Sequence, residues 1–197
     1  MQHEYKDDST GLNRIQIYTV KLKKGKIYMT KQDRKEDVWY TGNPCAKLGF
    51  ASQAYQKGCT CSQAVFAAFS EDMGLDQDTA CRIMEGFGGG FGGKQEVCGA
   101  FSAAAAVISY YFSSGSMDGK SKARTYQAIR RAAEIYEQEY GSINCREILH
   151  GNSPKAFQCG MKVKDAVLMV GKVLAESAEE LSEIRKSREA QKEAATV

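Results

Sequence analysis

The chain has 197 residues, of which 43% are hydrophobic, 26% are charged and two are prolines, as expected for one globular domain with some extra length. This composition excludes a disordered or fibrous protein. With 27 basic and 24 acidic residues the formal net charge is +3, too small an excess to indicate a nucleic-acid groove, so we expect no nucleic-acid partner.

The first 44 residues differ in composition from the rest and lack a helical stripe of apolar side chains. They alternate in short stretches such as residues 15–20, and we expect an irregular N-terminal extension over residues 1–44. Residues 1–14 lack the apolar core of a secretory signal, which favours a cytoplasmic protein. Met29 is an alternative start, because residues 23–28 can be back-translated into a purine-rich ribosome-binding sequence.

From residue 45 onward apolar residues recur at helical spacing, which predicts an all-α, single-domain bundle of about six or seven helices over residues 45–175. Three helices are expected first: residues 46–56, a second from an N-cap at Thr60 or Ser62 to Gly74, and a third through Met84 after an N-cap at Asp76.

A glycine-rich run, residues 86–94, follows the third helix and is the main irregular loop, because glycine entropy opposes a regular helix there. The next helix, from Cys98 to Phe112, is apolar nearly all round and is expected at the centre of the bundle. Residues 99–112 fall short of the about 20 residues that a membrane-spanning helix needs, so no membrane span is expected.

An amphipathic helix is predicted over residues 120–140, ended by Gly141 and followed by a short helical turn and a last helix up to residue 175. Beyond it, residues 176–197 are rich in charge and predict a solvated helix that frays. The expected inner stripe of the long helix is Tyr126, Ile129, Ala133, Tyr136 and Tyr140.

Seven cysteines, an odd number without an export signal, indicate metal ligation or thiol chemistry rather than a disulfide scaffold. The zinc spacing C-x2-C and the haem-attachment motif C-x-x-C-H are both absent. Since His3 and His150 are the only histidines, any metal site would be built mainly from sulfur. The cysteines are Cys45, Cys59, Cys61, Cys81, Cys98, Cys145 and Cys159.

Three cysteines, Cys61, Cys98 and Cys145, lie at predicted helix starts, where the positive end of the helix dipole favours the thiolate and lowers the thiol pKa. Beside Cys98, the glycine loop and Gly99-Ala100 leave little side-chain bulk, so another sulfur or a metal has room to approach. The alternative interpretation is three small half-buried residues at helix caps.

The sequence gives weaker evidence for a functional role of the other cysteines. Cys81 is expected mid-helix as a small core hydrophobe, Cys45 has no partner that can be inferred, and the role of Cys59 is open because a C-x-C disulfide is strained. The tyrosines of residues 126–140 indicate helix packing, and His150 a turn residue.

The glycine loop fits two nucleotide-binding patterns by chance alone. Gly88 through Lys94 fits G-x-x-x-x-G-K, but Gln95 replaces the hydroxyl residue and a helix precedes the loop. Gly88, Gly90 and Gly93 fit G-x-G-x-x-G without a βαβ unit. A flexible lid or close backbone contact is favoured over nucleotide binding.

Taken together, these motifs resemble the bacterial and archaeal family of redox-active proteins named for its C_GCAxxG_C_C pattern, over residues 46–175. One departure is Ala103, where the family has glycine. Some relatives resemble part of a split-Soret cytochrome, but no c-type haem is expected here. The motifs are Cys61-Ser-Gln-Ala, the Gly86-Phe-Gly-Gly-Gly loop, Cys98-Gly-Ala, Gly141-Ser-Ile-Asn-Cys145-Arg-Glu and Cys159.

The resemblance implies an all-helical redox or metal-centre domain whose signature cysteines are Cys61, Cys98, Cys145 and Cys159. We expect the sulfurs of these four cysteines to converge. The backbone expected to contact a bound cofactor beside them is that of Gly88, Gly89, Gly90, Gly99 and Ala100. Two chemical versions stay open: four thiolates that hold an iron-sulfur cluster or another soft metal for electron transfer, and a dithiol centre in which Cys98 attacks and another signature cysteine resolves.

The expected partners are a redox protein or a small thiol or disulfide substrate, and a homodimer is compatible with long amphipathic helices. A competing interpretation is a helical binding or accessory module of a transporter or redox complex, with structural cysteines. The separation of the four signature cysteines distinguishes these classes.

Overall fold

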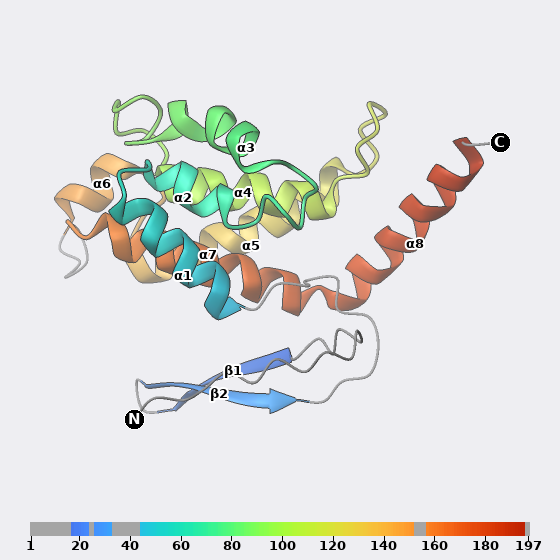
Figure 1. Ribbon diagram of the computed structural model, residues 1–197, viewed down its shortest axis with the longest axis horizontal. Helices are drawn as coiled ribbons and strands as arrows, with labels where there is room; N and C mark the ends of the chain where they lie inside the picture. Colours follow the sequence, from blue (N-terminus) through green and yellow to red (C-terminus); the bar gives the residue numbers. More distant parts are fainter. Residues whose placement is uncertain (1–16, 24–25, 33–43, 152–156, 196–197) are drawn as a thin grey trace, which may run out of the picture. The chain divides into compact units, whose positions relative to one another are not determined.

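The structure is a computed structural model that describes residues 17–23, 26–32, 44–151 and 157–195 (Figure 1). The chain divides into two compact units, residues 1–36 and residues 37–197, which are described separately.

The first unit contains a two-stranded antiparallel sheet. Strands β1 (Ile17–Lys23) and β2 (Lys26–Gln32) pair in a register that runs from Ile17 opposite Gln32 to Lys23 opposite Lys26. The prediction of an irregular extension is therefore wrong for these residues. The reason is that the first four residues of β1, from Ile17 to Val20, are all β-branched or aromatic, as strands prefer. Met29, the alternative start, lies within β2 and pairs with Val20.

The second unit is helical and confirms the all-α class of the bundle. Its described residues up to Glu176 contain seven α-helices, followed by a charged eighth. The helices are α1 (Pro44–Gln56), α2 (Cys61–Ala67), α3 (Gln77–Met84), α4 (Gly99–Phe112), α5 (Lys122–Tyr140), α6 (Cys145–His150), α7 (Cys159–Glu176) and α8 (Ala178–Ala195), with a 3-10 turn η1 (Glu85–Phe87) after α3.

Helix α2 ends earlier than predicted, at Ala67 rather than near Gly74. The amides of Phe69 and Ser70 bond carbonyls three residues back, and the Ser70 hydroxyl also donates to the Ala67 carbonyl. These bonds replace the four-residue spacing of an α-helix, so the chain continues as turns to Gly74, whose φ is +67°.

Helix α4 lies at the centre of the bundle, as predicted, and packs against α2, α5 and α7 (Figure 1). Ala100, Ala103 and Ala104 are fully buried along it. Their small side chains allow neighbouring helices to approach closely, so the methyl group of Ala103 is accommodated inside the core.

The inner face of α5 differs from the predicted stripe by about one residue. Tyr136 and Tyr140 are buried as expected, but Tyr126 is 50% exposed and Thr125 is buried in its place. Because neighbouring helix positions point about 100° apart, a small error in the orientation of the stripe exchanges such neighbours.

Helix α8 is better anchored than a freely solvated tail. Leu181 and Ile184 are buried against the bundle, and the Arg188 guanidinium donates to the carbonyl groups of Tyr110, Tyr111 and Ser113 at the end of α4. The expectation that this segment is simply solvated is therefore corrected. No described helix has both the length and the hydrophobicity to cross a membrane.

A buried ion pair joins α1 to the turns after α2. The Lys47 ammonium lies 2.7 Å from the Asp72 carboxylate, and both side chains are less than a tenth exposed. Lys47 also donates to the Ala68 carbonyl at 3.1 Å. This pair fixes the beginning of α1 against the core.

Candidate functional site

All four signature cysteines lie at helix N-termini. Cys61 is the first residue of α2, Cys98 is the N-cap of α4, Cys145 begins α6 and Cys159 begins α7. The first three placements were predicted from the sequence, whereas that of Cys159 was not. Four helix dipoles therefore present their positive ends to the four sulfurs.

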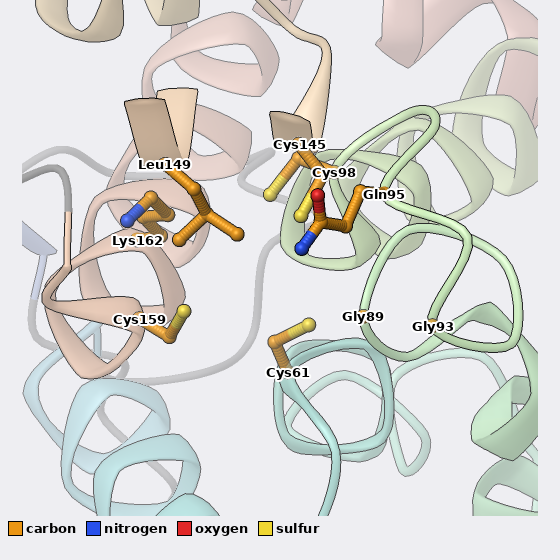
Figure 2. Close-up of a pocket in the computed structure, with 9 residues that line it drawn as sticks. All are labelled: Cys61, Gly89, Gly93, Gln95, Cys98, Cys145, Leu149, Cys159 and Lys162. Carbon is orange, nitrogen blue, oxygen red and sulfur yellow. The ribbon is translucent and has the colours of Figure 1, made fainter. Parts of the chain in front are cut away.

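These helix starts converge on one pocket, a cavity of about 200 Å³ (Figure 2). In the figure the four thiols are directed toward the space between them, with Cys98 and Cys145 together on one side. The lining residues are Cys61, Gly89, Gly93, Gln95, Cys98, Cys145, Leu149, Cys159 and Lys162. The structure thus brings together the four cysteines that the sequence separates by up to 98 positions.

Pairing of two chain segments explains why Cys98 and Cys145 are neighbours. Val97 forms an antiparallel bridge with Asn144, and the Cys98 amide donates to the Ile143 carbonyl at 2.8 Å. The Cys145 amide donates in turn to the Glu96 carbonyl at 2.5 Å. The end of the glycine loop and the approach to α6 therefore hold both helix starts at one place.

Close backbone contact, one of the two roles predicted for the glycine loop, is confirmed. A Cβ on Gly88 would lie 2.6 Å from the Cβ of Thr60, and one on Gly90 would lie 2.9 Å from the Cβ of Cys145. Gly89 lines the pocket, and its backbone hydrogen bond to Cys61 favours the thiolate there. Each of these glycines permits an approach that a side chain would block.

Gly99 has the same role at the start of α4. A Cβ there would lie 2.6 Å from the Phe87 carbonyl oxygen and 2.7 Å from Cys61 Sγ, distances that real Cβ atoms do not show. The adjacent Ala100 is fully buried in the core and does not line the pocket. Gly99 therefore sets how closely α4 approaches Cys61.

The loop backbone is unusual because five successive residues, Gly89 to Gly93, have φ between +59° and +78°. Four are glycines, but the third is Phe91, for which this left-handed conformation costs about 1 kcal/mol or more. Its ring packs on Phe87 with centroids 4.9 Å apart. Local strain at the rim of the pocket is typical of functional sites.

The prediction that helix starts lower the thiol pKa values is wrong for two cysteines. Burial raises the pKa of Cys61, and it raises the pKa of Cys145 to about 11. Repulsion from the neighbouring thiolates, Cys98 and Cys159 among them, acts in the same direction. Desolvation and mutual repulsion therefore outweigh the helix dipoles.

Three residues of the site were missed by the sequence analysis. The Tyr136 hydroxyl lies 3.3 Å from Cys98 Sγ in the buried interior, and Tyr55 hydrogen-bonds Cys159. Lys162, only 3% exposed, lines the pocket, and its charge favours the Cys145 thiolate. Lys162 comes three residues after Cys159, so helical spacing from that cysteine was the signal that could have found it.

The remaining cysteines lie outside this pocket. Cys45 is exposed on α1, whereas Cys59 and Cys81 are half-buried, and all seven cysteines are free thiols. No group of three or more His, Cys, Asp or Glu side chains in the described part of the chain is arranged to hold a metal ion. His150 is exposed, but it is the last residue of helix α6 and not a turn residue as expected.

Comparison with known proteins identifies the family. The family model described as Putative redox-active protein (C_GCAxxG_C_C) matches residues 59–173, which is more than half of the chain and includes the whole pocket. No curated protein and no solved structure matches the chain. The match therefore shows that the chain belongs to the C_GCAxxG_C_C family.

Proposed function

We propose that the four signature cysteines bind an iron-sulfur cluster and that the protein transfers single electrons through it. The family supports a redox role. The observation that carries the finer proposal is the convergence of four thiols from four helix N-termini on one pocket. Among the lining residues these thiols are the ligands that a soft metal centre prefers.

The raised thiol pKa values favour metal binding over nucleophilic catalysis. A catalytic thiol acts as the thiolate, and the pKa of Cys145, about 11, leaves it protonated at neutral pH. Burial acts in the same direction on Cys61. A metal centre supplies the positive charge that drives such thiols to lose their protons when it binds.

The volume of the pocket and the number of thiols favour a cluster over a single ion. A tetrahedral ion with metal–sulfur bonds of about 2.3 Å needs sulfurs only about 3.8 Å apart. No described group of side chains is arranged to hold one ion, yet all four thiols surround a cavity of about 200 Å³. A four-iron core takes four thiolates, each on its own iron atom, which matches the number of cysteines that line the pocket.

The surrounding charges suit a bound group with a net negative charge. Four thiolates outweigh the positive charge of an iron-sulfur core, and the four helix dipoles and the Lys162 ammonium offset the excess. The Gly89 amide and the Tyr136 hydroxyl supply hydrogen bonds to Cys61 and Cys98. These groups tune the affinity of the site for an electron.

The position of the pocket suits electron exchange with a partner. Cys98 and Cys145 are buried, whereas Cys61 and Cys159 are half-exposed. An iron-sulfur cluster, when bound, would supply one-electron chemistry. Cys98 and Cys145 would hold it on the buried side, and Cys61 and Cys159 on the more exposed side. We infer that the redox partner protein docks over Cys61 and Cys159.

Anaerobic reconstitution with iron and sulfide tests the proposal. We expect the folded full-length protein to take up both and to develop a visible absorption band. Replacing Cys61, Cys98, Cys145 or Cys159 with Ser should reduce cluster content, whereas Cys45→Ser, which changes an exposed sulfur outside the pocket, should not. Equal cluster content in all five variants would reject these ligands.

The pairing of Cys98 with Cys145 favours dithiol chemistry as the second candidate. In Figure 2 the two thiols lie on the same side of the pocket, and both are free thiols. In that case Cys98 attacks a disulfide substrate and Cys145 resolves the mixed disulfide, so that the pair is oxidised and the substrate reduced. Metal-free protein that forms a Cys98–Cys145 disulfide in turnover would favour it. Absence of both chemistries would favour the accessory-module interpretation.

A further inference from the structure

The side chain of Gln95 lines the four-cysteine pocket and has no role in the account so far. Apart from the thiols, the polar side chains that line the pocket are those of Gln95 and Lys162. Figure 2 shows the Gln95 carboxamide directed into the pocket, on the side of Cys98 and Cys145. In the described part of the chain this carboxamide has no hydrogen-bond partner. Its N–H groups can therefore donate to a group bound between the cysteines.

The backbone of Gln95 is strained. Its φ of +60° lies in the left-handed region, which is unfavourable for a residue that carries a Cβ atom. Glycine adopts this conformation readily, and four of the five left-handed residues from Gly89 to Gly93 are glycines. A glutamine at this position therefore lowers the stability of the loop. Strain of this kind is typical of residues that a functional site requires.

Contacts on both sides hold the Gln95 backbone in this conformation. Its amide donates to the Gly89 carbonyl at 3.0 Å, and its carbonyl accepts the Arg146 amide at 2.9 Å. The Arg146 guanidinium also donates to the carbonyl of the preceding residue, Lys94, at 3.2 Å. Gly90 packs so closely that a Cβ there would lie 3.0 Å from the carbonyl carbon of Gln95. Because these contacts fix the backbone, they also fix the direction of the side chain toward the pocket.

The chemistry of a carboxamide suits a negatively charged sulfur centre. Its NH₂ group carries two donors and no charge, whereas the Lys162 ammonium acts mainly through its charge. Beside such a centre the Gln95 carboxamide turns its NH₂ group inward, because its carbonyl oxygen is repelled. Gln95 and Tyr136 then supply neutral donors from two different parts of the chain, the loop and helix α5.

We propose that the Gln95 carboxamide donates a hydrogen bond to a sulfur of the bound centre and thereby raises the reduction potential of that centre. This inference rests on the proposed cluster. Hydrogen bonds to the sulfurs are among the features that set the potential, because they stabilise the more negative, reduced state more than the oxidised state. The strained backbone of Gln95 is the means by which the loop places this donor.

Redox titration of the reconstituted full-length protein tests the proposal. Gln95→Leu removes the donor and keeps a side chain of similar size, and Gln95→Glu replaces the donor with a carboxylate. We expect the reduction potential to be lower than in the wild type in Gln95→Leu and lowest in Gln95→Glu. Gln127→Leu is the matched control, because Gln127 is exposed on α5 and lies outside the pocket. It should keep the wild-type potential.

Chemical denaturation of the metal-free protein distinguishes this role from a structural one. Gln95→Gly relieves the left-handed strain, so we expect its denaturation midpoint to lie above that of the wild type. A side chain that served only to pack the loop would give the opposite result. A lower midpoint in Gln95→Gly would therefore overturn the proposal.

The iron content of every sample is measured with its potential. A wild-type potential in Gln95→Leu or Gln95→Glu, at full iron content, would overturn the role of Gln95 and leave the cluster proposal intact. Loss of iron from both variants would also overturn it, because a neutral donor tunes the centre without holding it. Gln95→Glu suffices if Gln95→Leu does not fold. Wild-type protein that takes up no iron would overturn both proposals.

Discussion

The buried thiol of Cys98 lies 3.3 Å from the hydroxyl of Tyr136, at the inner wall of the four-cysteine pocket. Once Cys98 binds a metal as a thiolate, it can only accept, so the Tyr136 O–H must donate. The pKa of Tyr136 is raised well above its ordinary value, mainly by burial, which keeps its proton in place. A hydrogen bond from the neutral Tyr136 hydroxyl to the Cys98 thiolate stabilises the reduced state of the centre more than the oxidised state, because the reduced state is more negative.

The first prediction follows from that contact. Tyr136→Phe should lower the reduction potential of the bound centre, because the reduced state loses more from the missing hydrogen bond than the oxidised state. A difference of about 1 kcal/mol corresponds to about 40 mV for one electron. Tyr140→Phe is the matched control, since its hydroxyl donates to Asp165 at 2.7 Å. Equal shifts in both variants would contradict the role of Tyr136.

The second prediction concerns the contact between α4 and Cys61. Gly99→Ala places a methyl group 2.7 Å from Cys61 Sγ and 2.6 Å from the Phe87 carbonyl oxygen. We expect a loss of about 1 to 3 kcal/mol of stability, together with reduced cluster content. Gly171→Ala on α7 is the control, because nothing lies within 4 Å of the added methyl group, and it should stabilise the protein by about 0.5 to 1 kcal/mol.

Chemical denaturation and iron analysis of the two glycine variants provide the measurement. A Gly99→Ala protein with wild-type stability and full iron content would show that the close approach of α4 is not required.

The third prediction is a pH dependence of the metal-free protein. The pKa of Cys145 is raised from 9.0 to about 11, mainly by burial, so the fold favours the protonated thiol. Its contribution to stability is complete below pH 9 and is lost as the pH rises toward 11. We expect Cys145→Ser to reduce the loss across this window by about 1 kcal/mol. Denaturation curves of the wild type and of Cys145→Ser, recorded between pH 9 and pH 11, provide the measurement. Equal losses of unfolding free energy in the two proteins would show that Cys145 is not responsible.

The fourth prediction tests the ion pair that anchors α1. Lys47→Met leaves the Asp72 carboxylate buried without the ammonium that lies 2.7 Å from it, which should cost about 3 to 5 kcal/mol. The exposed pair of Arg82 with Asp78 is the control, and Arg82→Ala should cost less than about 1 kcal/mol. Thermal denaturation that ranks the two variants equally would contradict the burial argument.

Local sequence signals were sufficient to predict most of the helical fold. Periodicity and caps predicted the α4 and α5 segments, and Asp76 caps α3 as expected. The strands β1 and β2 were missed although residues 15–20 alternate, because the alternation was not matched to a pairing partner. The rotation of α5 that exposes Tyr126 depends on tertiary packing, which local periodicity fixes only to within one position.

The four cysteines of the candidate site were predictable, but its other side chains and its electrostatics were not. Helix starts and family resemblance indicated the four cysteines, yet the rise in the pKa of Cys61 and Cys145 depends on burial and on thiols from other helices. The contact of Tyr136 with Cys98 joins residues 38 positions apart. No local pattern encodes such a distance, so the donor appears only once α4 and α5 pack together.

Reductive titration of protein purified anaerobically, with iron and acid-labile sulfide determined on the same sample, tests the central claim most directly. The account predicts iron and sulfide in a fixed ratio to the chain, and an electron paramagnetic resonance signal that appears on one-electron reduction and disappears on reoxidation. Folded protein that holds no iron or sulfide, even after reconstitution, would contradict it.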